Sequence, residues 1–167
     1  VLSIVVIYLF ADGRTKKVGV VQFHELIYEY RGMKDATRSY TGKIDKWSKQ
    51  IDTLEFGLKK LIEEIKIDSI NNDKKKLKKD YELFLLKRQS YYDYKNKLDQ
   101  AASEEDKKMT LGVINQVNEH IKAFAIKHGY DIIISNTEER NVGYVKEAVD
   151  ITKQVIEFAN ENYDGKN

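Results

Sequence analysis

Residues 42–67, GKIDKWSKQIDTLEFGLKKLIEEIKI, decide the fold. The apolar side chains in this stretch recur at alternating intervals of three and four residues. They are Ile44, Trp47, Ile51, Leu54, Leu58, Leu61 and Ile65. This spacing is typical of a helix that packs along another helix. We therefore expect a first long helix here, and at about 1.5 Å per residue it would be roughly 40 Å long.

A polar turn at residues 68–73 (DSINND) precedes a second periodic run. The apolar positions of this run are Leu77, Tyr81, Phe84, Leu85, Tyr91, Tyr92 and Leu98. The pattern predicts an antiparallel helical hairpin. Its seam would join the seven apolar residues of the first helix to four residues of the second: Leu77, Tyr81, Phe84 and Leu98. Asp73 suits the N-cap of the second helix, and Gly129 suits its C-cap. The second helix would then run without a break to His128.

Short apolar stretches precede and follow this hairpin in the sequence. Residues 17–23 (KVGVVQF) and 130–135 (YDIIIS) read as strands, and residues 142–145 as a short third strand. Residues 24–30 fit a short helix, and Gly32 with residues 39–42 would loosen the chain before the first arm. Asp150 would cap a final helix. The expected fold class is α+β, with a small β body and a long protruding hairpin.

That body is too small to cover its own sheet. Three consecutive isoleucines, Ile132, Ile133 and Ile134, favour burial of both faces of one strand. A domain of this size is close to the limit of independent stability, so we expect a core shared between copies. The candidate residues of this oligomer core are Val18, Val20, Val21, Phe23, Ile132, Ile133, Ile134 and Val155.

Residues 1–11 (VLSIVVIYLFA) are apolar and carry no charge, and basic residues follow. Their length is about half of the ~20 residues that a membrane-spanning helix needs. Three interpretations stay open: the end of a signal peptide, a retained membrane anchor, or an element of the fold.

Composition and motifs exclude several function classes. The net charge of +2 is not that of a nucleic-acid-binding protein, and the absence of cysteine rules out a thiolate metal site. The sequence shows neither a phosphate-binding glycine loop nor a nucleophile motif. His24, His120 and His128 are too scattered for a ligand cluster. We expect no enzymatic activity, no metal and no cofactor.

The arms carry two candidate contact surfaces. From residue 43 to residue 99 there are 15 Lys and Arg and 11 Asp and Glu, a net of +4. A basic run at the tip could attract acidic polypeptides or anionic lipid headgroups. Tyr91, Tyr92 and Tyr94 point in different directions on one helix, so at least one should face outward. The candidate contact residues are Tyr91, Tyr92, Tyr94, Lys74, Lys75, Lys76, Lys78 and Lys79.

Four stretches resemble the Skp/OmpH-type periplasmic chaperones. They are KVGVVQFHELIYEY (17–30), KIDSINNDKKKLKKD (66–80), GYDIIIS (129–135) and VDITKQVIEFAN (149–160). The resemblance implies a jellyfish-like homotrimer in the periplasm of a Gram-negative bacterium. It also implies an ATP-independent holdase that keeps unfolded outer-membrane proteins between its helical arms.

On this resemblance the chain divides into three parts. Residues 1–15 would be a signal-peptide remnant or anchor, residues 16–41 with 112–167 the trimerisation body, and residues 42–111 the tentacle arm. A second hypothesis is a non-catalytic structural adapter of a cell-envelope complex, which a retained anchor would tether to the inner membrane. The apolar N-terminal segment and the aromatic arm favour the adapter, and the generally polar arms favour the chaperone. Membrane contact would come through residues 1–11 or the basic arm tips.

Overall fold

The computed structural model describes residues 15–137 and 142–165. They divide into two compact units, unit 1 with the described residues up to Thr37 and from Thr110 onward, and unit 2 with Arg38–Met109. The elements in chain order are β1 (Val18–Gln22), α2 (Phe23–Glu29), α3 (Arg31–Ile70), α4 (Lys74–His128), β2 (Ile132–Asn136), the 3₁₀ turn η1 (Glu147–Val149) and α5 (Thr152–Glu161). The expectations for residues 1–11 lie outside the described residues.

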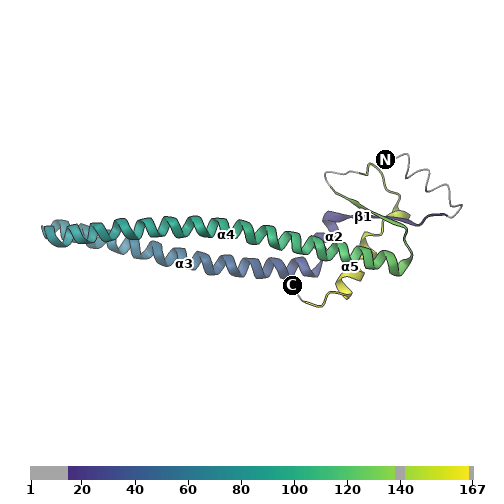
Figure 1. Cartoon of the computed structure of the whole chain (residues 1–167), viewed down its shortest axis with the longest axis horizontal. Coiled ribbons are helices and arrows are strands. Elements are labelled where there is room, and N and C mark those ends of the chain that lie inside the picture. The colour runs from purple at the N-terminus through teal and green to yellow at the C-terminus, as the bar shows by residue number, and fades with distance from the viewer. Residues whose placement is uncertain (1–14, 138–141, 166–167) are drawn as a thin grey trace. The chain divides into compact units, whose positions relative to one another are not determined.

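Unit 2 consists of the parts of α3 and α4 between Arg38 and Met109, which run antiparallel and side by side (Figure 1). The ammonium group of Lys43 lies 2.6 Å from the carboxylate of Glu105, and the Tyr94 hydroxyl donates to the side chain of Gln50. At the turn, Asn72 adopts a positive φ of 55°, a conformation that asparagine tolerates better than most residues. The predicted helical hairpin is therefore confirmed.

The bounds of α4 follow the cap residues in the sequence. The carboxylate of Asp73 accepts the backbone N–H of Lys76 at 3.1 Å, which satisfies one of the free donors of the first turn. Gly129 follows the last helical residue with a φ of 68°, the usual left-handed conformation of a C-terminal glycine.

The predicted start of the first helix is wrong. Helix α3 begins at Arg31, well before Gly42, and passes through Gly32 and Gly42 without interruption. A helical glycine costs only about 1 kcal/mol relative to alanine, which tertiary contacts easily offset. Here the chain breaks instead at Tyr30, whose extended ψ of 129° separates α2 from α3.

The seam of unit 2 is only partly shielded from solvent. Leu61 is buried, whereas Leu54 and Tyr81 are exposed. The other predicted seam residues are half-buried: Ile44, Trp47, Ile51, Leu58, Ile65, Leu77, Phe84 and Leu98. Two isolated helices can bury one stripe of each, so this partial burial is expected of a hairpin that has no third element.

Unit 1 is organised around two parallel strands. β1 pairs with β2 in the register Val18↔Ile132 to Gln22↔Asn136, although more than 100 residues separate them in sequence. On the other side of β1, the backbone N–H of Ile151 donates to the carbonyl of Val20 at 2.9 Å. The core of unit 1 combines side chains from every α-helix in it: Val20, Val21, Leu26, Tyr30, Ala36, Val113, Val117, Phe124, Ile151, Val155 and Ala159.

Three details of unit 1 differ from expectation. Residues 142–145 do not form a strand, and the pairing beside β1 is a single bridge between Val20 and Asp150. Phe23, expected at the end of the first strand, is the first residue of α2. The N-cap of α5 is Ile151 and not the expected Asp150, although the Asp150 carboxylate accepts the backbone N–H of Thr152, the first helical residue, at 2.9 Å. The small two-stranded sheet and the long hairpin together confirm the predicted fold class.

Candidate functional site

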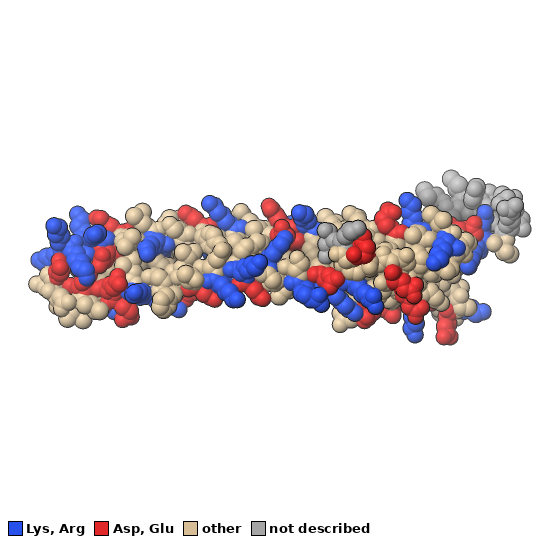
Figure 2. Space-filling view, turned by 90° about the horizontal axis from the view of Figure 1, so that it is seen from below, with Lys and Arg blue, Asp and Glu red and all other residues tan. Residues whose placement is uncertain are grey.

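The surface of unit 2 mixes charged and large apolar side chains. Figure 2 shows Lys, Arg, Asp and Glu dispersed over it, with uncharged surface between them. Phe56 is 71% exposed and Leu86 is 69% exposed. The other large apolar residues that face solvent here are Leu54, Ile62, Ile67, Ile70, Tyr81, Leu83, Leu85 and Tyr92. Unit 2 therefore presents large apolar side chains to solvent along both of its helices.

The three tyrosines singled out from the sequence have different environments. Tyr92 is 54% exposed, while Tyr91 and Tyr94 are half-buried. The rings of Tyr91 and Tyr92 meet edge to face with their centroids 5.3 Å apart. Tyr92 is therefore the most exposed of the three tyrosines. The hydroxyl of Tyr94 is in addition already engaged by Gln50.

One of the five lysines at the hairpin tip, Lys76, is engaged in an ion pair. Lys76 forms an ion pair of 2.8 Å with the buried carboxylate of Asp68, and this pair lowers the pKa of Asp68. Burial, followed by the nearby Asp68 carboxylate, raises the pKa of Asp80. The remaining lysines of the predicted group are exposed: Lys74, Lys75, Lys78 and Lys79.

A polar cluster inside unit 1 was not found from the sequence. The hydroxyl of Tyr30 lies 3.1 Å from Oε1 of Gln116 and 3.1 Å from Nε2 of His120. Burial, with further contributions from Tyr163 and Asp164, raises the pKa of Tyr30 to about 12. Burial also lowers the pKa of His120.

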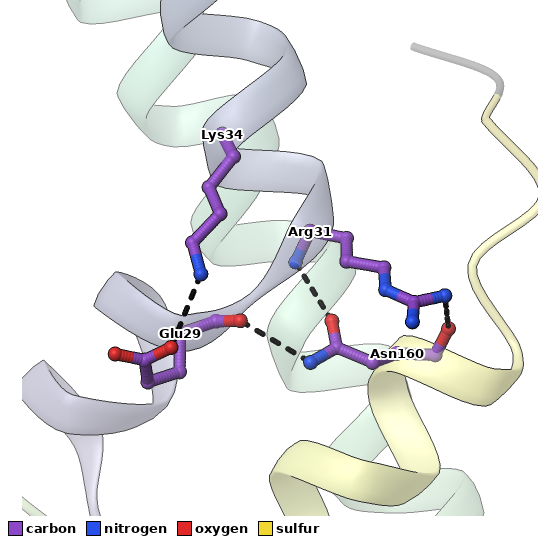
Figure 3. A network of polar contacts seen from close by, with 4 residues as sticks. All are labelled: Glu29, Arg31, Lys34 and Asn160. Carbon is purple, nitrogen blue, oxygen red and sulfur yellow. Dashed lines mark hydrogen bonds and ion pairs between the residues drawn. The ribbon is translucent and has the colours of Figure 1, made fainter.

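Asn160 of α5 holds the junction between α2 and α3, as Figure 3 shows. Its side-chain oxygen accepts the backbone N–H of Arg31 at 2.7 Å, and its amide nitrogen donates to the carbonyl of Glu29 at 3.2 Å. Lys34 adds an ion pair of 3.1 Å with Glu29. A useful sequence signal for this junction is Gly32, because a Cβ there would lie 2.3 Å from the Tyr30 ring.

The candidate oligomer-core residues fall into two groups. Val20, Val21 and Val155 are buried within one chain, and Ile134 is 41% exposed. The half-buried members are Val18, Phe23, Ile132 and Ile133. Phe23 lies in an open apolar groove of about 370 Å³, together with Ile27 and Met33. Ile134 is therefore the candidate whose side chain is most available to a second chain.

Neither a metal cluster nor a membrane span is visible in residues 15–137 and 142–165. Within these residues, no three His, Asp or Glu side chains come close enough to hold an ion. Among the helices described there, none combines the length and apolar character needed to cross a bilayer.

The geometry defines a class of protein with a long helical hairpin and a small unit built on two parallel strands. A family model described as outer membrane protein (OmpH-like) matches residues 17–158. The chain therefore belongs to the OmpH-like family, which confirms the resemblance found in its sequence.

A solved structure supports the same fold. It is that of a candidate outer membrane chaperone (OmpH-like) from Caulobacter crescentus CB15, with a TM-score of 0.77. The match covers 89% of this chain and 86% of that one, at 11% sequence identity. A search of curated proteins found no match. At such low identity the structural match concerns the fold.

Proposed function

We propose that this protein is an ATP-independent periplasmic chaperone that holds unfolded outer-membrane proteins on the surface of its paired helices. The observation that carries the proposal is the exposure of large apolar side chains along unit 2, above all Phe56 and Leu86. Membership of the OmpH-like family and the likeness to a candidate outer membrane chaperone support it.

The chemistry of the surface suits an unfolded β-barrel chain. Such a chain exposes alternating apolar side chains and unpaired strand edges, which aggregate if nothing covers them. Scattered apolar residues separated by charges bind each segment weakly and without a fixed sequence. Many weak contacts at high effective concentration then add up to stable holding.

We further propose that three copies assemble through the sheet of unit 1. Ile134 on β2 is 41% exposed in a single chain, although aliphatic residues of a small sheet normally face a core. A neighbouring copy would cover it, and three assembled copies would bring three hairpins to one client. The trimer supplies the multivalency that weak contacts require.

The decisive experiment dilutes a denatured outer-membrane porin into buffer and follows its aggregation by light scattering. Wild-type protein should suppress aggregation at a near-stoichiometric ratio of trimer to porin, without ATP. The triple variant Phe56→Gln, Leu86→Gln, Tyr92→Gln should lose most of this activity. Glutamine is a good helix former, so the hairpin should stay intact.

A matched control replaces exposed lysines on the same helices, Lys60→Gln, Lys87→Gln and Lys97→Gln. This control should suppress aggregation like the wild type. Equal activity of both triple variants would contradict the proposed surface. If the wild type does not suppress aggregation and copurifies with one fixed partner, the structural-adapter hypothesis is favoured over the chaperone hypothesis.

A further inference from the structure

The seam of the hairpin ends in two aspartates, which lie within hydrogen-bond reach of each other across α3 and α4. In α3 the alternation of three and four residues continues from Ile65 to Asp68, and Asp68 is only 3% exposed. In α4 Asp80 follows the seam residue Leu77 by three positions and is half-buried, whereas its neighbour Tyr81 is 53% exposed. A seam position normally takes an apolar side chain, and a buried charge there is costly unless it is paired.

Lys76 compensates only one of the two carboxylate oxygens of Asp68. Its ammonium group lies 2.8 Å from Oδ1. The other oxygen, Oδ2, is buried, and among the residues that the structure describes no N–H or O–H group donates to it. The carboxyl group of Asp80 is placed to form a hydrogen bond with Asp68. Two ionised carboxylates can only accept hydrogen bonds, so Asp80 can supply the missing donor only when it carries a proton.

We propose that Asp68 and Asp80 form a proton-controlled clasp between the two helices of the hairpin. With one proton on the pair, the Asp80 hydroxyl donates to the Asp68 carboxylate, which also accepts from Lys76. Without that proton, two like charges face each other in the seam, and this part of the hairpin opens more readily. The proposal does not rest on the holding of unfolded proteins, because the clasp joins the two helices whatever they bind.

The charges around the pair favour the proton on Asp80. The hydrogen-bonded ion pair with Lys76 lowers the pKa of Asp68. Burial, followed by the hydrogen bond and the charge of Asp68, raises the pKa of Asp80; the charge of Glu64 on α3 raises it further, and the charge of Lys76 opposes the shift. The pair therefore titrates in two steps, on either side of the ordinary aspartate pKa of about 3.9.

The sign of the pH dependence follows from these two shifts. The folded chain holds the Asp80 proton more tightly than the unfolded chain does, so this contribution to stability is lost as the pH rises through the raised pKa of Asp80. The contribution of Asp68 is lost as the pH falls through its lowered pKa. The clasp is therefore closed most firmly between the two steps, and it loosens as the pH rises above the upper one.

The test measures hydrogen exchange of the full chain by mass spectrometry, as protection factors corrected for the intrinsic pH dependence of exchange. In the wild type, protection of residues 61–68 and 77–84 should rise as the pH is lowered from about 7.5 to about 4.5. Asp80→Asn carries an amide donor at every pH, so it should remove this dependence. At about pH 7.5 it should raise protection about tenfold, the scale of one hydrogen bond to a charged acceptor. Asp80→Ala should also remove the dependence, with a smaller gain, because it only removes the like charge.

The matched control is Asp99→Asn, which neutralises an exposed aspartate on the same helix. It should keep the wild-type protection and its pH dependence. The proposal is overturned if the wild type shows the same protection of residues 61–68 and 77–84 at both ends of the pH range, or if Asp80→Asn keeps the wild-type dependence. It is also overturned if Asp99→Asn gives the same gain as Asp80→Asn, since the effect would then come from net charge.

Discussion

The side-chain oxygen of Asn160 accepts a hydrogen bond of 2.7 Å from the backbone N–H of Arg31, the first residue of α3. The same amide donates to the carbonyl of Glu29, the last residue of α2. One side chain of α5 therefore satisfies a free donor at the start of one helix and a free acceptor at the end of another. This arrangement explains how the chain turns at Tyr30 without leaving these groups unpaired.

Removal of this amide should destabilise unit 1. Asn160→Ala leaves the Arg31 N–H and the Glu29 carbonyl without their partner, which we expect to cost about 1–2 kcal/mol of the free energy of unfolding. Urea denaturation followed by circular dichroism, at one fixed protein concentration, measures this change. The exposed Asn118→Ala on α4 is the control and should stay within about 0.5 kcal/mol of wild type. Equal effects of the two substitutions would refute the bridging role.

Two glycines of α3 should respond in opposite directions to alanine. A Cβ on Gly32 would lie 2.3 Å from the Tyr30 ring, whereas nothing lies within 4 Å of a Cβ on Gly57. Gly57→Ala should raise the free energy of unfolding by up to about 1 kcal/mol through helix propensity. Gly32→Ala should lower it by about 1–3 kcal/mol, because the ring must move. Thermal unfolding of both variants tests the pair, and a stabilised Gly32→Ala would show that the Tyr30 ring is not packed as described.

The contact between Tyr30 and His120 should make stability depend on pH. Burial lowers the pKa of His120 from its ordinary 6.5, although the charge of Asp164 opposes this shift. The unfolded chain therefore binds a proton more readily, so stability is complete above about pH 6.5 and falls as the pH drops through the folded pKa.

The prediction is that the unfolding midpoint of wild type decreases between pH 7.5 and pH 5.5, and that His120→Gln flattens this dependence. His24→Gln is the control, because His24 is exposed, and it should keep the wild-type slope. Parallel curves for wild type and His120→Gln would mean that His120 does not carry the effect.

Assembly should depend on the exposed isoleucine of β2. Ile134→Asp introduces a charge at a side chain that is 41% exposed in one chain, so the single subunit should tolerate it. A charge buried in a shared core is costly, and the variant should sediment as a monomer of 19.5 kDa. Sedimentation velocity of wild type should give a trimer, and the unit 2 variant Leu86→Asp should remain one. A trimeric Ile134→Asp would place the subunit contact elsewhere.

Local signals predicted the hairpin well and the junctions poorly. The heptad pattern from Ile44 to Ile65, the Asp73 cap and Gly129 all act within a few residues, so they can be interpreted from a single sequence. The start of α3 at Arg31 depends on Asn160, which is 129 residues away in sequence. No local sequence pattern can indicate a contact between residues so far apart.

The same reasoning applies to the candidate sites. Helix geometry predicted that at least one of Tyr91, Tyr92 and Tyr94 faces outward, but not which one; in the structure it is Tyr92. The ion pair between Lys76 and Asp68 could not be predicted from the sequence, because it depends on how α3 and α4 meet at the turn. The cluster around Tyr30 was also missed, because Gln116, His120 and Tyr163 meet it only in the folded unit 1.

The proposed holding surface is tested most directly by site-specific photo-crosslinking. A photoreactive phenylalanine analogue at position 56 or 86 should crosslink to a denatured porin diluted into the solution. The same analogue at position 20, a buried valine of β1 in unit 1, is the background control. Strong porin adducts from positions 56 and 86, with only background from position 20, are the predicted result. Adducts no stronger at positions 56 and 86 than at position 20 would contradict the assignment of client binding to the paired helices.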